Sequence, residues 1–141
     1  MTQEKKDLLI KDLCTRLPYG VRIAYRCNHI HELRAILKNG LVMIADIITN
    51  EYVTRSVENI IPYLFPLSNM TEEQYYEMQS ISGKDCMEHM EVEKEWRNNS
   101  QFNHLPLYQH RVIEFFHKHH FDYRGLIPMG LANDATGLNI Y

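Results

Sequence analysis

The sequence has few cysteines and no long apolar run. Only Cys14, Cys27 and Cys86 carry thiols, and an odd number of widely spaced cysteines leaves no complete disulfide framework. The longest apolar run, residues 41–45, is far shorter than the roughly 20 residues of a membrane-spanning helix. The charged start, residues 1–7, lacks the apolar stretch of a signal peptide. We therefore expect a cytoplasmic protein with no membrane segment.

Motifs of familiar catalytic and metal-binding classes are also missing. The sequence contains no glycine-rich phosphate loop, no HExxH element and no paired CxxC element. No candidate nucleophile has a recognisable adjacent base. An apolar share of 45% is nevertheless ordinary for a protein with a folded core. These observations favour a folded, non-enzymatic protein with no cofactor, although they leave the enzyme question open.

Charge is distributed unevenly along the chain. Residues 1–55 carry nine Lys/Arg and six Asp/Glu, a net of +3, whereas residues 56–141 carry six and twelve, a net of −6. Most of the acidic excess lies in residues 72–95, where eight carboxylates accompany two lysines. Such a segment is typical of a solvated helix face. The alternative is an acidic surface that meets a basic partner or mimics nucleic acid.

The first part of the chain predicts a helix followed by a strand. Apolar residues recur at helical spacing over residues 3–17. Pro18 and Gly20 end this helix, because proline disfavours helix in the preceding residue and glycine accepts unusual dihedral angles. Residues 21–27 then alternate apolar and polar side chains, which predicts a strand with one buried face that includes Tyr25.

Residues 28–40 fit either a helix or a strand and turn. A helix would stop at Asn39–Gly40, but the same dipeptide favours a tight hairpin turn between residues 32–37 and 41–48. We prefer the hairpin, because the neighbouring strands need partners. Residues 52–61 would add a further strand or two. The predicted fold class is α+β, with a small curved antiparallel sheet or an SH3-like partial barrel.

The remainder of the chain is predicted to be mainly helical. Residues 62–70 form an extended segment pinned on the core by large apolar groups. Thr71 and Gln74 form a capping box that starts a helix. Residues 80–103 predict a loop and a loosely docked helix, and residues 107–119 a final helix. We expect one domain, residues 1–141, in which a helix and small sheet (1–70) pack against a helical part (71–141).

Three segments resemble a family of small uncharacterised proteins of phages, prophages and mobile elements of gut bacteria. The matching sequences are KDLCTRLPYGV (11–21), IPYLFPLSNMTEE (61–73) and HHFDYRGLI (119–127). The family pattern has an arginine near Phe65 and a charged residue near Pro128, and this chain departs from it at both positions. The resemblance implies a mobile-element origin and carries no catalytic residue.

The histidines near the C-terminus are candidate metal ligands. His117 and His120 lie one helical turn apart, and Asp122 follows closely. Imidazole and carboxylate groups bind zinc when three or four of them converge. The alternative is that these histidines cap a helix C-terminus, where the helix dipole favours them. Asp122 is also placed to cap a short final helix, with Arg124 pairing to it or to another carboxylate.

A basic strand face is the candidate nucleic-acid site. Its residues are Arg22, Arg26, Arg34 and Lys38, provided that the hairpin forms. Basic groups of small sheets bind phosphates while aromatic side chains stack on bases. Few aromatic residues accompany these cations, and the pI of about 6.2 disfavours non-specific binding.

We therefore favour a protein-interaction module over a nucleic-acid-binding barrel or a metal-dependent hydrolase. The expected partner is an unknown protein, nucleic acid is possible but not favoured, and the oligomeric state is open. The candidate contact residues lie in the segment 62–70 and at the start of the helix after it: Tyr63, Phe65, Glu72, Glu73 and Glu77.

Overall fold

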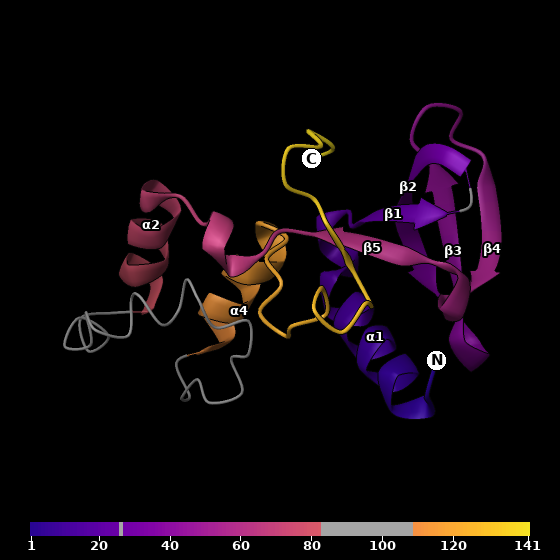
Figure 1. Ribbon diagram of the computed structural model, residues 1–141, viewed down its shortest axis with the longest axis horizontal. Coiled ribbons are helices and arrows are strands. Elements are labelled where there is room, and N and C mark those ends of the chain that lie inside the picture. Colours follow the sequence, from indigo (N-terminus) through magenta and orange to yellow (C-terminus); the bar gives the residue numbers. More distant parts are fainter. Residues whose placement is uncertain (26, 83–108) are drawn as a thin grey trace.

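The computed structural model describes residues 1–25, 27–82 and 109–141. Within them the chain is of the α+β class, with a sheet at one end and two helices at the other (Figure 1). The helices are α1 (Gln3–Arg16), α2 (Glu72–Ser82) and α4 (Gln109–Lys118). The strands are β1 (Arg22–Tyr25), β2 (Cys27–Ile36), β3 (Leu41–Asp46), β4 (Tyr52–Ser56), β5 (Ile61–Leu64) and β6 (Asn133–Asp134).

The sheet has the strand order β4-β3-β2-β1-β5-β6. Its first five strands are antiparallel, as predicted, whereas β6 runs parallel to β5. In the described residues the sheet does not close into a barrel, because β4 and β6 remain its two edges, and the SH3-like partial barrel is not confirmed. Because β6 comes from the C-terminal part of the chain, that part is not wholly helical.

The hairpin prediction for residues 32–48 is confirmed. Asn39 and Gly40 have φ angles of 62° and 71°, the left-handed values that this dipeptide adopts readily. The amide of Leu37 donates to the carbonyl of Leu41 at 2.8 Å and closes the turn. In place of the competing helix, this part of the chain forms β2, which pairs with both β1 and β3.

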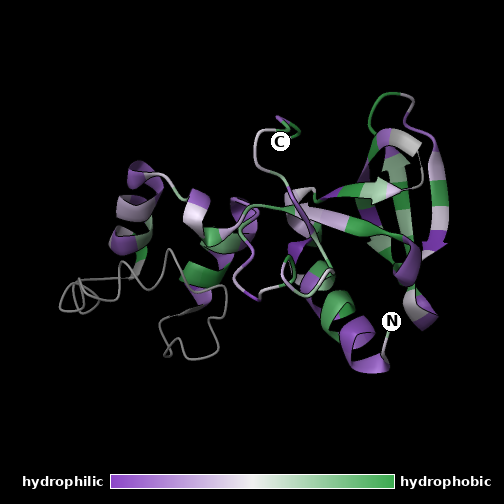
Figure 2. Cartoon of the chain, in the orientation of Figure 1, coloured by the Kyte–Doolittle hydropathy of each residue, from purple (hydrophilic) through white to green (hydrophobic). Residues whose placement is uncertain are grey.

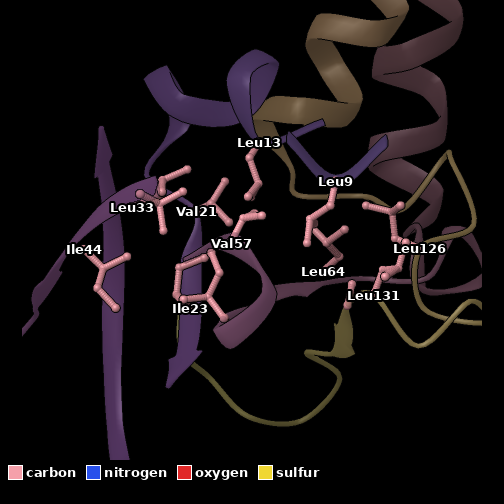
Figure 3. Close-up of a cluster of buried hydrophobic side chains, with 13 residues drawn as sticks. Leu9, Leu13, Val21, Ile23, Leu33, Ile44, Val57, Leu64, Leu126 and Leu131 are labelled. Atoms are coloured by element: carbon pink, nitrogen blue, oxygen red, sulfur yellow. The ribbon is translucent and has the colours of Figure 1, made fainter. Parts of the chain in front are cut away.

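The sheet and α1 enclose an aliphatic core. The hydroxyl of Thr2 caps α1 by accepting a hydrogen bond from the amide of Lys5 at 3.3 Å. Gly20, with φ of 70°, turns the chain out of the helical region as predicted. Leu9 and Leu13 of α1 are fully buried and point toward the sheet (Figure 3). This core contains Leu9, Leu13, Val21, Ile23, Leu33, Val42, Ile44, Val57, Ile60, Leu64, Leu126, Leu131 and Ala132.

A second, largely aromatic core lies between α2 and α4. As predicted, Thr71 and Gln74 exchange a capping box: the amide of Gln74 donates to the Thr71 hydroxyl at 3.2 Å, and the amide of Thr71 donates to Gln74 Oε1 at 2.9 Å. The final helix is also confirmed, and its apolar stripe faces inward. The cluster contains Leu67, Met78, Val112, Phe115, Phe116, Phe121 and Tyr123.

The segment 62–70 connects the two cores. It starts in β5 and ends in a short 3-10 turn whose Leu67 is buried. The amide of Phe65 donates to the carbonyl of His120 at 2.9 Å, and the amide of Asp122 donates to the carbonyl of Phe65 at 2.8 Å. The prediction that this segment is extended and pinned on the core is therefore confirmed.

Some predictions fall wholly or partly outside the described residues. These are the loop and docked helix at 80–103, the acidic residues from 83 to 95, and Arg26. One expectation on the sheet needs correction: Tyr25 is half-buried, because the face of β1 that it shares with Ile23 is only partly covered at this end. Among the described helices none has the length and apolarity to span a membrane.

Candidate functional site

The predicted basic strand face is neutralised by a carboxylate. Arg22 and Glu32 are cross-strand partners, and Arg22 Nη1 pairs with Glu32 Oε2. Arg34 Nη1 lies 3.0 Å from Glu32 Oε1. Lys38 is exposed in the hairpin turn, and Arg26 lies outside the described residues. Since Glu32 pairs with two of the four candidate cations, this face offers less positive potential to a phosphate backbone than the sequence suggests.

The three candidate metal ligands bind different partners. His117 meets Tyr123, His120 stacks on Tyr141, and both oxygens of Asp122 accept backbone amides of the following turn at 2.8 Å. Over residues 1–25, 27–82 and 109–141, no three His, Cys, Asp or Glu side chains are grouped to hold a metal ion. Asp122 does act as a cap, but of a turn rather than of a helix.

A buried ion pair links α1 to the turn that follows α4. Asp12 and Arg16 are both fully buried, and Arg16 Nε donates to Asp12 Oδ2 at 2.6 Å. Arg16 Nη2 also donates to the carbonyl of Phe121 at 2.8 Å. Arg124 Nε lies 3.1 Å from Asp12 Oδ1 but directs its proton to the hydroxyl of Tyr123. Arg16 therefore joins α1 to the turn after α4 through its hydrogen bond to Phe121, and Arg124 adds an ion pair to Asp12.

His117 belongs to the same buried network. The Tyr123 hydroxyl accepts a hydrogen bond from Arg124 Nε at 2.9 Å and lies 2.9 Å from His117 Nε2. The Thr15 hydroxyl lies 3.3 Å from the same nitrogen. Burial, reinforced by the charge of Arg16, lowers the pKa of His117 to about 4. The network is structural, because His117 is only 4% exposed.

A cleft of about 360 Å³ opens beside this network, at the turn after α4. Aromatic rings form part of its wall, and amide, hydroxyl and imidazole groups form the rest. Lys118 contributes the one formal charge of the lining residues, and none of them is a carboxylate. The lining residues are Phe65, Asn69, Thr71, Gln74, Lys118, His119, His120, Phe121 and Tyr141.

His120 has an unusual backbone and environment at this cleft. Its φ of 59° lies in the left-handed region, which non-glycine residues adopt at a cost. The side chain is 8% exposed, and within the described residues its Nδ1 is buried without a hydrogen-bond partner. Burial, together with the charges of Arg16 and Arg22, lowers the pKa of His120 to about 4.

Tyr141 covers one side of the cleft. Its ring stacks on His120 with a centroid distance of 3.7 Å and lies 5.7 Å from the ring of Phe65. Its hydroxyl donates to the carbonyl of Tyr63 at 2.5 Å and accepts the amide of Arg22 at 3.1 Å. Burial raises the pKa of Tyr141 to about 12. Two predicted contact residues therefore contact Tyr141: Tyr63 through its carbonyl and Phe65 through its ring.

The other three predicted contact residues lie on α2. Glu77 approaches α4, with Oε1 3.7 Å from Lys118 Nζ and Oε2 3.5 Å from His119 Nε2. Glu72 accepts a hydrogen bond from the Tyr76 hydroxyl at 3.3 Å, and Glu73 is exposed. In the described part of the acidic segment, Glu77 therefore contacts Lys118 and His119, whereas Glu72 and Glu73 do not contact α4.

At the opposite end of the molecule, the loop between β3 and β4 carries apolar residues, drawn green in Figure 2. Ile48 is 78% exposed, Tyr52 55% and Ile47 44%. Asp46 holds this loop, because its Oδ1 accepts the amides of Ile48 at 2.7 Å and of Thr49 at 3.0 Å. These two hydrogen bonds, with a third from His29, lower the pKa of Asp46 to about 2. The apolar tip (Ile47, Ile48, Tyr52) is consequently a fixed surface.

The tip continues into β4, which has no further neighbour among the described strands. The amide of Asp46 donates to the carbonyl of Glu51 at 3.0 Å, which makes these two residues a hydrogen-bonded pair. Because such pairs alternate along an antiparallel ladder, Val53 and Arg55 bond to β3. The backbone groups of Tyr52, Thr54 and Ser56 therefore point away from the sheet, and Arg55 Nη1 reaches the Thr54 carbonyl at 2.7 Å.

Sequence reasoning found neither the cleft nor the free edge as sites. The density of aromatic and histidine residues in 115–124 was a signal for the cleft, but the pattern gave no sign that Tyr141 would complete it. In the sequence, Ile47 and Ile48 fit the end of a buried strand, but in the structure both side chains are exposed. Searches of protein-family models, curated proteins and solved structures each found no match to this chain.

Proposed function

We propose that this chain is a non-enzymatic protein-interaction module that adds an extended segment of a partner protein to the edge of β4. A mobile-element accessory role, which the family resemblance implies, would agree with such a module. The observation that carries the proposal is the outward-facing backbone of β4, which pairs with no further strand in the described residues, next to the apolar tip. In strand addition, main-chain hydrogen bonds supply affinity and the flanking side chains supply specificity.

The β4 edge has few of the features that protect edges from pairing. Native edge strands are usually blunted by proline, charged side chains, bulges or very short length. The segment Tyr52–Ser56 has no proline, and its pairing with β3 runs from Ala45–Tyr52 to Leu41–Ser56 without a register shift. Its one charged side chain, Arg55, donates to the Thr54 carbonyl, so the outward-facing amides are the groups left for a partner strand. An uninterrupted, regular edge is a template for another strand.

The chemistry of the edge indicates what the added segment carries. The guanidinium of Arg55 lies at the edge, since it donates to the Thr54 carbonyl, while its Nε donates to the Tyr25 hydroxyl at 2.5 Å. A partner carboxylate beside Arg55 would complement this charge and the positive balance of residues 1–55. Apolar side chains of the partner would cover Ile48 and Tyr52.

The experiment compares Thr54→Pro with Thr54→Val. The amide of Thr54 points away from β3, so proline removes only a hydrogen bond that a partner would use. Valine keeps the amide and the β-branched shape. Tagged wild-type and variant chains are used to capture proteins from host lysate after nuclease treatment. We expect one partner that both wild type and T54V retain and that T54P loses about tenfold or more, since a main-chain bond and close strand contact are lost together.

A second variant tests the apolar tip. Ile48→Asp places a charge on the most exposed apolar side chain and should release the same partner, whereas Leu138→Asp, at an exposed leucine elsewhere, should not. A nuclease-resistant partner that binds T54P and I48D as well as wild type would contradict strand addition. Capture that disappears with nuclease would instead favour nucleic-acid binding.

A further inference from the structure

We propose that the cleft at the His119–His120 turn is a binding site for a small organic oxyanion, a phosphate or carboxylate on an apolar body, held by Lys118 and the His120 imidazole. The cleft is separate from the β4 edge, which lies at the other end of the molecule (Figure 1). The inference therefore does not depend on the partner protein. Four properties of the cleft carry it.

The first property is the size and lining of the cleft. About 360 Å³ lies at the low end of the range of roughly 300–1,000 Å³ that ligand pockets occupy, and it fits one ring with an attached anionic group. Phe65, Phe121 and Tyr141 supply apolar wall, and Asn69 and Gln74 supply amides. A lining with a lysine and no carboxylate suits an anion and disfavours a cation.

The second property is the hydrogen-bonding state of His120. Its Nδ1 is buried and has no hydrogen-bond partner in the described residues. A proton on Nδ1 would leave an orphaned buried N–H group, so the neutral ring carries its proton on Nε2. In this tautomer the imidazole that lines the cleft has a donor at Nε2, and an oxyanion in the cleft would be an acceptor for it.

The third property is the charge around the cleft. The charges of Arg16 from α1 and Arg22 from β1 lower the pKa of His120, although Asp12 and Glu32 pair with these two arginines and weaken their field. Lys118 is 62% exposed in its side chain, and its contact with Glu77 is 3.7 Å long, so the ammonium group can turn toward a ligand. Glu77 opposes the field of these cations from α2, but it does not line the cleft.

The fourth property is the backbone conformation of the same residue. His120 has a left-handed conformation that ends α4, because the amides of His120 and Phe121 donate to the carbonyls of His117 and Phe116 at 3.1 Å and 2.8 Å. The carbonyl of His120 is held by the amide of Phe65. This fixed turn places the imidazole against Tyr141 and at the cleft.

The test is a titration of the full-length chain, followed through the ring nitrogen resonances of the histidines at constant ionic strength. The probes are inorganic phosphate, acetate, phenyl phosphate and phenylacetate, with chloride as the reference salt. We expect a saturable shift of the His120 resonances with a phosphate or a carboxylate probe, and tighter binding of the phenyl form. His29 and His110, which lie outside the cleft, should not shift in a saturable way.

Two variants with a matched control make the result specific. Lys118→Met should weaken binding about tenfold, the effect of losing about 1.4 kcal/mol. His120→Asn removes the imidazole but tolerates the left-handed backbone, and it should abolish the saturable response, followed on His119. Lys11→Met makes the same charge change at an exposed site on α1 and should leave binding unchanged.

The outcomes separate cleanly. Saturable binding that K118M and H120N weaken and K11M does not supports the site, and the preferred probe identifies phosphate or carboxylate as the anionic group. No saturable shift of His120 with any probe up to about 50 mM, near the weak limit of specific binding, would overturn it. Equal binding by wild type, K118M and H120N would overturn it as well, because the anion would then lie elsewhere.

Discussion

The sheet half and the helical half of this molecule are built on different principles. The sheet and α1 enclose an aliphatic core in which Leu9, Leu13 and Ile23 have no exposed surface. The helical half encloses phenylalanines instead and is joined to α1 by Arg16, which pairs with Asp12 within the helix and donates to the Phe121 carbonyl. The β2–β3 hairpin follows from a local pattern, whereas this joint connects groups more than 100 residues apart in sequence.

This difference extends to the surfaces that the two halves offer. The sheet half presents outward-facing backbone amides along β4, which no other described strand pairs, together with a fixed apolar tip. The helical half leaves side-chain groups, the His120 imidazole and the Lys118 ammonium, at a cleft. Backbone groups recognise extended chains of many sequences, whereas convergent side chains recognise a specific chemical group. The chain thus carries two surfaces suited to two kinds of ligand.

The largest expected effect comes from breaking the buried joint with Arg16→Ala. This substitution leaves Asp12 charged and buried and removes the donor to the Phe121 carbonyl, so we expect a loss of about 3–5 kcal/mol in the free energy of unfolding. Denaturant unfolding measures it. Arg111→Ala, at an exposed arginine of α4, is the control and should change stability by less than about 0.5 kcal/mol. A loss for R16A no larger than for R111A would show that the joint is not needed.

A slightly smaller effect is expected from Leu13→Ala in the aliphatic core. Removing a fully buried leucine side chain costs about 2–5 kcal/mol through lost transfer energy and the cavity left behind. Leu138→Ala, which truncates an exposed leucine, should cost far less. Unfolding followed separately by a probe in each half sharpens the comparison: coincident transitions mean that the two cores unfold as one unit, and separate transitions mean that they do not.

The capping box is expected to contribute less than either core. Thr71→Ala removes the acceptor for the Gln74 amide and should lower stability by about 0.5–2 kcal/mol. Thr71→Ser keeps the hydroxyl and should restore most of the loss. Thermal unfolding of the three proteins measures both changes, and equal losses for alanine and serine would show that the hydroxyl does not cap α2.

The smallest expected effect is a pH dependence of stability that arises in the helical half. The folded-state pKa values of His117 and His120 are lowered to about 4 from 6.5, so the unfolded chain binds more protons between these values. Stability should therefore be complete above pH 6.5 and fall as the pH drops toward 4. His117→Gln and His120→Asn should each flatten this slope, and His110→Gln, at an exposed histidine, should not. If the slope of stability against pH is unchanged in both variants, the pH dependence belongs to other titratable groups.

Much of the fold follows from short-range signals in the sequence. The period of Leu9 and Leu13 predicts α1, Thr71 and Gln74 predict the start of α2, and Asn39–Gly40 predicts the β2–β3 turn. Each of these signals acts within a few residues, so tertiary contacts do not override it. The sheet edge β6 could not be predicted in this way, because a two-residue strand has no periodicity and forms only where β5 is available.

The sites were less predictable because they depend on contacts across the chain. Asp12 and Arg16 have the spacing of an ordinary surface ion pair on a helix, and only the approach of the Phe121 turn buries them. In the sequence, Arg22 and Arg34 have the pattern of unpaired cations. In the structure, the β1–β2 register places Glu32 within reach of both. The cleft requires Tyr141 to return to His120. No local pattern encodes these encounters.

The central claim, that β4 is an edge open to another strand, is tested most directly by amide hydrogen exchange of the free chain. We predict alternation along β4: the amides of Val53 and Arg55 are protected by β3, and those of Tyr52, Thr54 and Ser56 exchange rapidly. Addition of the partner should then protect the second set. Slow exchange of the Thr54 amide in the free chain would mean that the edge is already covered, and it would contradict the proposal.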